Sequence, residues 1–197
     1  MWSDFRPTLL FLLRFFLTYG LLSAAYGIFI KQYDQSEPQV RDPFTHWVVE
    51  QVAQLAKWQG YEVVIEENAH LNYAKTAEEQ TFDTLIFNDI RAIAVEEGCN
   101  GLSVMILFVS FVLAFGGNFK RLLWFIPAGL LLIHLSNLIR LYLLAILKVD
   151  FEGQYFHFFH KYGFTAVIYL SVFLLWYVWV QFLVKPSAHK NAQDAVA

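Results

Sequence analysis

The residue most able to do chemistry is Cys99, the single cysteine of the 197-residue chain, in the stretch EEGCNGLSV (96–104). A cysteine thiolate is a strong nucleophile, and the start of a helix favours the thiolate because the helix dipole lowers the thiol pKa. Gly98 and Gly101 allow a tight backbone turn and close substrate approach. Three other interpretations remain for this residue alone: a small buried apolar residue, half of an intermolecular disulfide, or a residue without a role.

The second candidate is Arg140, which lies deep in the apolar stretch HLSNLIRLYLLAIL (134–147). A charged residue in a membrane helix is costly and usually faces the bundle interior or a water-filled cavity. Asn137 precedes Arg140 by three residues and therefore shares its helix face. An arginine that snorkels to the interface is the alternative, but the pairing with Asn137 favours an inward polar face.

The third candidate is a histidine pair, His157 and His160, in FHFFHKYGF (156–164). The spacing could suit a metal, but no third protein ligand and no His-Glu-x-x-His pattern accompanies it, so we predict no metal and no cofactor. Solvated or interfacial histidines are the other interpretation. The remaining histidines considered are predicted to be structural or exposed: His46, His70 and His134.

Four apolar stretches must position these residues. The chain is 57% hydrophobic and 18% aromatic, with a mean hydropathy of +0.44. Because about 20 apolar residues span a bilayer, we predict an all-α integral membrane protein with about four transmembrane helices, at 11–30, 101–116, 122–147 and 162–184. The first stretch ends in LLSAAYG, which resembles a signal-peptide cleavage site, but its length favours a retained helix.

Between the first two helices lies a polar insert, which we predict to be extracytoplasmic. Asp42 and Pro43 read as a helix cap and first helical residue, and Gly60 as a stop. The apolar spacing between them is typical of an amphipathic helix, and its two tryptophans suggest that it lies on the outer membrane surface. A strand is predicted at 61–67, and TLIFND and RAIAVEE (84–97) are predicted to form two more short strands or one bent strand. The insert is too small for an independent catalytic domain.

Charge predicts the orientation. Residues 31–97 hold thirteen acidic and five basic side chains, whereas the flanks and the short connector before the third helix are basic. Basic residues in short flanks mark the cytoplasmic side. No basic patch suggests nucleic-acid binding. We therefore predict a multi-pass protein of the inner (cytoplasmic) membrane in four parts: a first transmembrane helix (1–30), the insert (31–98), a membrane catalytic core of three helices (99–184) and a cytoplasmic tail (185–197).

This topology brings Cys99, Arg140 and His160 to the same, outward membrane face. Such a set is what thiol-based acyl transfer needs. The thiolate attacks a carbonyl, the guanidinium stabilises the oxyanion, and the imidazole delivers a proton to the leaving amine.

The order of the three motifs resembles that of the exosortase/archaeosortase family: Glu-x-Cys-x-Gly (97–101), Asn-x-x-Arg (137–140) and His-x-x-Gly (160–163). The resemblance covers roughly residues 40–180 and is closest to the compact exosortase F subfamily. Gly98 and Asn100 replace the alanine and serine of the usual cysteine motif, whereas the cysteine, arginine and histidine are intact.

The resemblance implies an integral membrane cysteine transpeptidase. Such an enzyme cleaves a C-terminal sorting signal of secreted proteins, composed of a short motif, a hydrophobic helix and a basic cluster. It passes the acyl group to a surface amine or to water. By the same resemblance, Cys99 is the nucleophile, Arg140 the oxyanion or substrate-binding group, and His160 the acid/base. His160 is preferred to His157 because Gly163 follows it at the family spacing. The implied partners are these secreted substrates and the lipid bilayer.

Two functions of other kinds remain open on the sequence. A non-catalytic assembly or partner-binding subunit of an envelope complex would tolerate Cys99→Ala. A metal-dependent hydrolase built on His157 and His160 would be sensitive to chelators. Within the enzyme class, proteolysis without transfer is not separated from transpeptidation. Glu96 and Glu97 would raise the thiol pKa if they lay close, so we expect them to point away from it or to bind the basic part of a substrate.

Overall fold

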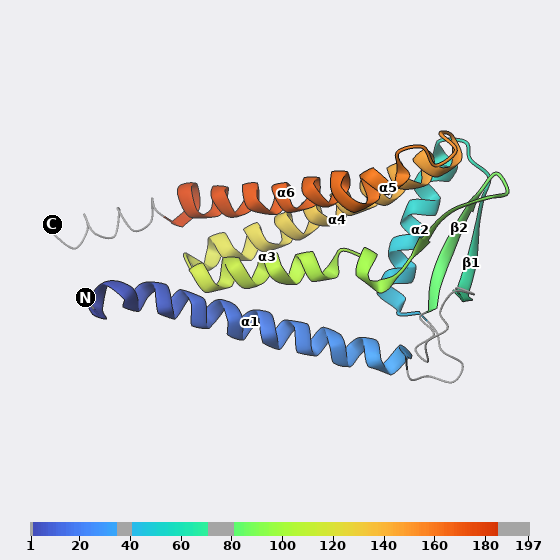
Figure 1. The fold of residues 1–197 in the computed structure, drawn as a ribbon. Coiled ribbons are helices and arrows are strands. Elements are labelled where there is room, and N and C mark those ends of the chain that lie inside the picture. Colours follow the sequence, from blue (N-terminus) through green and yellow to red (C-terminus); the bar gives the residue numbers. More distant parts are fainter. Residues whose placement is uncertain (1, 35–40, 71–80, 185–197) are drawn as a thin grey trace. The chain divides into compact units, whose positions relative to one another are not determined.

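The computed structural model describes residues 2–34, 41–70 and 81–184, and it is mostly helical with one small sheet (Figure 1). Three helical stretches in these ranges are long and apolar enough to cross a membrane: Phe5–Tyr33, Phe119–Val149 and Phe156–Phe182. A fourth apolar helix, α3 (Leu102–Phe115), is shorter. The predicted membrane protein with about four apolar helices is therefore confirmed. The polar stretch NAHLNYAKTAEEQ (68–80) predicts a loop, and its 71–80 part lies outside the described residues, as does the predicted tail at 185–197.

The first and third apolar helices are longer than predicted. Helix α1 runs over Trp2–Asp34 and α4 over Phe119–Val149. The predicted basic connector thus shortens, and its Lys120 and Arg121 lie in the first turn of α4. Asn118 begins that turn, because its side-chain oxygen accepts a hydrogen bond from the backbone N–H of Lys120 at 2.9 Å.

The last apolar stretch is one succession of helical segments: α5 (Phe156–Phe158), the π-helical η2 (Phe159–Gly163), α6 (Phe164–Val178) and the π-helical η3 (Trp179–Val184). A π-helical turn is rare and is found often at functional sites. Segment η2 contains His160, so the candidate histidine lies in locally unusual backbone.

Helix α2 (Pro43–Trp58) begins and ends where the sequence predicts. The Asp42 side chain accepts hydrogen bonds from the backbone N–H groups of Phe44 and Thr45, at 3.0 and 2.9 Å. Pro43 is the first helical residue and loses nothing by lacking an N–H there. Gly60 follows the helix at φ +93°, a conformation that glycine adopts without strain.

The insert also forms an antiparallel sheet of β1 (Val63–His70), β2 (Thr81–Phe87) and β3 (Ile90–Val95), paired in that order. Asn88 and Asp89, both at positive φ, join β2 to β3 in the two-residue turn that suits the twist of a hairpin. Residues 84–97 therefore hold parts of two strands rather than one bent strand, and β2 begins three residues earlier than expected.

The chain divides into two compact units, and the boundary runs through α1, α4 and the last helical stretch. One unit, here called the mixed unit, comprises Tyr26–Gly101 and His134–Val167. Its core is formed by the apolar face of α2, by β2 and β3, and by Leu141, Leu144 and Ala145 of α4. The apolar face of α2 is buried against protein and not left for lipid, whereas the position of the helix on the outer membrane surface stays a prediction. The large apolar side chains of α2 that remain exposed are Trp47 (48% exposed) and Trp58 (75% exposed).

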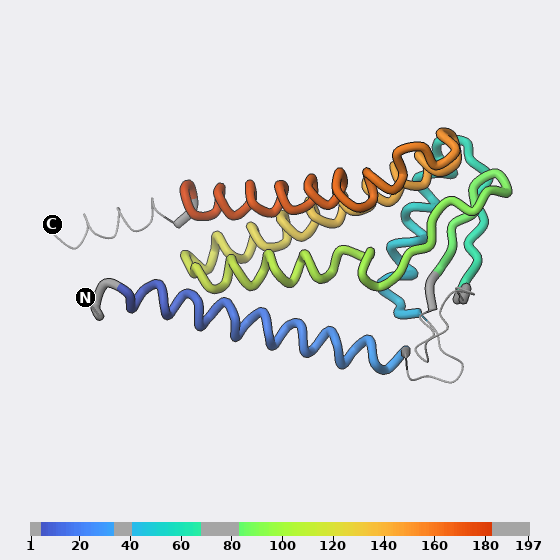
Figure 2. The backbone as a smooth tube through the Cα atoms, viewed as in Figure 1, coloured from blue at the N-terminus to red at the C-terminus, as the bar shows by residue number. Residues whose placement is uncertain are grey.

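The other unit, here called the helical unit, comprises Met1–Ala25, Leu102–Ile133 and Ile168–Ala197; its backbone path can be followed in Figure 2. Aromatic pairs dominate its packing. Phe111 stacks on Trp176 with ring centroids 4.2 Å apart, and the Phe125 and Trp179 rings lie 4.8 Å apart. Phe108 is fully buried against Gly129, where an added Cβ would come within 2.3 Å of the phenyl ring.

Candidate active site

Cys99 ends a short 3₁₀ turn, η1 (Glu97–Cys99), three residues before α3 begins. Its backbone N–H donates to the carbonyl of Glu96 at 2.8 Å. The thiol residue is half-buried and packs against the core of the mixed unit. The cysteine is therefore held by backbone geometry and by packing before any catalytic partner is considered.

The side chain of Asn100 anchors this turn to two helices. It is fully buried, and its side-chain N–H group donates to the Tyr26 hydroxyl of α1 at 2.9 Å and to the Thr45 hydroxyl of α2 at 3.0 Å. Two hydroxyl partners on different helices, the half-buried Tyr26 and the buried Thr45, fix the residue after the cysteine. In the sequence, Asn100 stands out only as a departure from the usual cysteine motif, and no local pattern predicts this anchoring role.

Asn137 of α4 holds the backbone of Cys99 by a second hydrogen-bond contact to this turn. Its side-chain N–H group donates to the Cys99 carbonyl at 2.9 Å, and the residue is fully buried. Gly101 has φ +84°, and a Cβ there would lie 3.2 Å from the Asn137 amide. The expectation that glycine allows a tight turn and a close approach therefore holds at Gly101. At Gly98 an added Cβ would meet open space.

Arg140 lies one helical turn after Asn137 and is half-buried. Its guanidinium is close enough to act electrostatically on both the Cys99 thiol and the His160 imidazole. Arg140 of α4 thus lies near each of the other two residues that the sequence singled out, Cys99 of η1 and His160 of η2. His160 itself is exposed, and its ring stacks on Phe156 at 5.6 Å between centroids.

The glycine that follows His160 also has a packing reason. A Cβ at Gly163 would approach the Phe159 ring to 2.7 Å. Gly163 therefore leaves room for the Phe159 ring within the π-helical segment that carries His160. His157 is exposed on the preceding segment, and among the described residues no group of three or more His, Cys, Asp or Glu side chains could hold a metal ion.

The environment of the thiol differs from the sequence expectation. Burial raises the pKa of Cys99 above its ordinary value, the Arg140 guanidinium lowers it in part, and the Glu96 carboxylate raises it further. The predicted lowering by the helix start is therefore outweighed by desolvation. Of the two alternatives expected for Glu96, pointing away from the thiol does not hold, because its carboxylate raises the thiol pKa, whereas binding the basic part of a substrate stays a prediction.

His134 completes the polar face of α4. Its Nε2 lies 2.9 Å from the Gln51 side-chain oxygen, and its ring stacks on Trp47 at 4.8 Å. The prediction of a structural histidine agrees with this packing. The contacts join α4 to α2 and so support the helix that carries Asn137 and Arg140.

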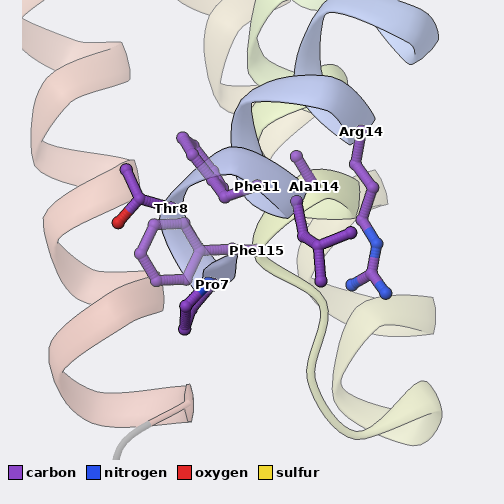
Figure 3. Close-up of a pocket in the computed structure, with 7 residues that line it drawn as sticks. Pro7, Thr8, Phe11, Arg14, Ala114 and Phe115 are labelled. Atoms are coloured by element: carbon purple, nitrogen blue, oxygen red, sulfur yellow. The ribbon is translucent and has the colours of Figure 1, made fainter. Parts of the chain in front are cut away.

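A cavity of about 580 Å³ lies within the helical unit, between α1 and the end of α3 (Figure 3). Its walls are mainly apolar, with the Arg14 side chain at one edge. The cavity is lined by Pro7, Thr8, Leu10, Phe11, Arg14, Ala114 and Phe115. None of these is a candidate catalytic residue.

Apolar helices long enough to cross a bilayer, with a cysteine turn tied to one of them, define a multi-pass membrane protein with a candidate thiol site. The family described as Transmembrane exosortase (Exosortase_EpsH) matches residues 3–177. The chain therefore belongs to the transmembrane exosortase family. No curated protein and no solved structure gives a significant match.

Proposed function

We propose that this protein is a membrane cysteine transpeptidase that cleaves a C-terminal sorting signal from secreted proteins. The observation that carries the proposal is the convergence on Cys99. Asn137 binds its carbonyl at 2.9 Å, and Arg140 acts electrostatically on both its thiol and His160. Family membership supports the same assignment.

The reaction proceeds through a thioester. The Cys99 thiol gives its proton to His160, and the sulfur attacks the carbonyl carbon of the scissile peptide bond. Arg140 stabilises the negative charge that develops on the carbonyl oxygen. The C–N bond then breaks as His160 delivers the proton to the departing amine. An acceptor amine, or water, then attacks the thioester carbonyl and loses a proton to His160. The C–S bond breaks, and His160 returns the proton to the departing sulfur, which restores the Cys99 thiol.

The raised pKa of Cys99 suits this order of events. With burial favouring the neutral thiol, the resting enzyme holds little free thiolate at neutral pH. The nucleophile is then formed mainly when substrate and His160 are in place, which limits side reactions of an exposed thiolate. The field of Arg140, strengthened in surroundings of low dielectric, offsets part of the cost of forming the anion.

The substrates are secreted proteins with a C-terminal transmembrane tail, cut at the outward face of the inner membrane. A substrate with its own membrane helix diffuses in two dimensions, and lateral docking of that helix positions the scissile bond. Positioning of this kind contributes several kcal/mol, roughly, to the lowering of the barrier. The sorting motif and the acceptor are the finer points of this proposal.

The test follows the C-terminal tails of co-resident secreted proteins by mass spectrometry in cells with wild type, Cys99→Ala or Cys99→Ser. We expect tail removal with wild type and tail retention with both variants. Gly98→Ala is the matched control, because it changes the neighbouring residue in open space. Equal processing by Cys99→Ala and wild type would overturn the proposal and favour a non-catalytic assembly subunit.

A further inference from the structure

One face of α4 carries three buried polar atoms that have no hydrogen-bond partner: His134 Nδ1, Asn137 Oδ1 and Arg140 Nε. They recur every third residue, so each lies next to the following one on the helix surface. Buried polar groups without partners are uncommon in folded proteins. Three in a row beside the candidate nucleophile therefore call for an explanation.

Two of these atoms are chemically complementary. Asn137 Oδ1 only accepts hydrogen bonds, and Arg140 Nε–H only donates them. Side chains on a helix tilt toward its N-terminus, so the Arg140 stem runs back toward Asn137. Residues three apart are also neighbours on a helix surface. A modest change of side-chain rotamer therefore allows the donor to reach the acceptor.

The other half of the Asn137 amide is already committed. Its nitrogen donates to the Cys99 carbonyl at 2.9 Å, which fixes which way the amide faces and aims the oxygen elsewhere. Gly101 confines the amide further, since an added Cβ would lie 3.2 Å from it. His134 is an unsuitable partner for this oxygen, because its ring is held by Trp47 and Gln51.

We propose that Asn137 is a positioning residue that joins the nucleophile to the arginine, its amide nitrogen holding the Cys99 carbonyl and its amide oxygen receiving the Arg140 Nε–H. The terminal guanidinium nitrogens then stay directed at the thiol and at the substrate oxygen. The catalytic meaning of this link rests on the proposed function, whereas the link itself is a property of the resting protein.

Because Cys99 is the only cysteine, its reactivity can be read directly. The rate of iodoacetamide alkylation is measured against pH in the detergent-solubilised full chain for wild type, Asn137→Leu, Arg140→Gln and the double variant. We expect each single substitution to raise the pH midpoint, because the guanidinium no longer favours the thiolate. A rise of about one pH unit slows alkylation at neutral pH about tenfold.

The double variant is decisive. If Asn137 acts through Arg140, the double variant shifts the midpoint no further than Arg140→Gln alone. Additive shifts, or an unchanged midpoint in Asn137→Leu, would overturn the link. Gln51→Leu is the control, because it removes a polar contact of the same α4 face without touching either partner, and it should leave the midpoint unchanged. Should Asn137→Leu not fold, Asn137→Ser carries the same expectations.

Processing of substrate separates this link from the proposed function. We expect Asn137→Leu to lower kcat with little change in KM, as for loss of an interaction made in the transition state. If Cys99→Ala still processes substrate, the proposed function fails. The alkylation result still tests whether Asn137 joins Cys99 to Arg140. If Cys99→Ala is inactive and the shifts are additive, the function stands and the link is wrong.

Discussion

Among its described residues, the helical unit buries one polar side chain, that of Ser110. The Ser110 hydroxyl donates to the Ile106 carbonyl of its own helix at 2.7 Å. The mixed unit buries seven: Asp42, Thr45, Asp83, Thr84, Asn100, His134 and Asn137. Several of these reach across to other elements, as Asn100 does to α1 and α2. The helical unit relies instead on aromatic and aliphatic packing.

This difference shows that the two units hold their side chains in place by different kinds of interaction. Apolar packing is non-directional and tolerates exchange of one side chain for another of similar volume. A buried hydrogen bond demands one partner in one orientation, and its loss leaves the other group unsatisfied. The residues that could do chemistry, Cys99, Arg140 and His160, all belong to the mixed unit, where such constraints are dense.

The largest expected effect comes from Arg140. We predict that Arg140→Gln lowers the rate of tail removal by about 100- to 1000-fold, as for loss of one oxyanion donor. Arg140→Lys should not restore it, because lysine lacks the forked donor geometry. Arg14→Gln in the helical unit should remain near wild type. The rates are measured on isolated membranes, and equal losses at Arg14 and Arg140 would remove the distinction between the units.

The next effect concerns stability. Asn100→Ala deprives Tyr26 and Thr45 of a buried donor, and we expect it to lower the free energy of unfolding by about 1–3 kcal/mol. Ser110→Ala removes a bond within one helix and should cost less than about 1 kcal/mol. Denaturant unfolding in detergent, followed by circular dichroism, compares the two. A larger loss for Ser110→Ala would contradict the comparison.

A substitution in the helical unit should affect stability without affecting chemistry. Gly129→Ala places a methyl group against the Phe108 ring, and such overpacking typically costs about 1–3 kcal/mol, with the lower end expected where a ring can shift. Alkylation of Cys99 should keep its wild-type pH midpoint in this variant. A changed midpoint would show that packing in the helical unit tunes the thiol.

A smaller effect concerns the charge next to the thiol. Because burial raises the pKa of Cys99 and Glu96 adds to that rise, we expect an alkylation midpoint above the ordinary thiol value of about 8.5. Glu96→Gln should lower the midpoint, in the direction opposite to Arg140→Gln. Because the pKa of Cys99 is raised in the folded protein, its protonated form stabilises the folded state. This contribution is present below the ordinary thiol pKa and is lost as the pH rises through the raised pKa of the folded protein. An upward shift in Glu96→Gln would refute this assignment.

The smallest effect lies at the edge of the mixed unit, where the Tyr61 hydroxyl donates to the Asp150 carboxylate. The hydrogen bond to Asp150, followed by burial, raises the pKa of Tyr61 to about 12. We expect Tyr61→Phe to cost at most about 1 kcal/mol at neutral pH, because the pair is exposed. Since the folded pKa is raised, the difference from wild type should be constant below about pH 10 and shrink toward pH 12. A difference that grows over this range would contradict the assignment.

The sequence by itself determined the local elements. The apolar lengths predicted the membrane helices, and Asp42, Pro43 and Gly60 predicted the limits of α2 because caps and stops act within a few residues. The spacing of Asn137 and Arg140 placed both on one helix face. The order of the three motifs indicated the exosortase family, which the comparison with known families confirmed.

Tertiary structure decided what these elements face. The apolar stripe of α2 could have met lipid or protein, and only the fold buried it against β2, β3 and α4. The hydrogen-bond partners of the cysteine turn lie 38 to 74 residues away along the chain, beyond the reach of any local pattern. Whether the helix start or burial dominates the pKa of Cys99 also depends on how much protein surrounds the thiol, because desolvation is set by neighbours that are distant in sequence.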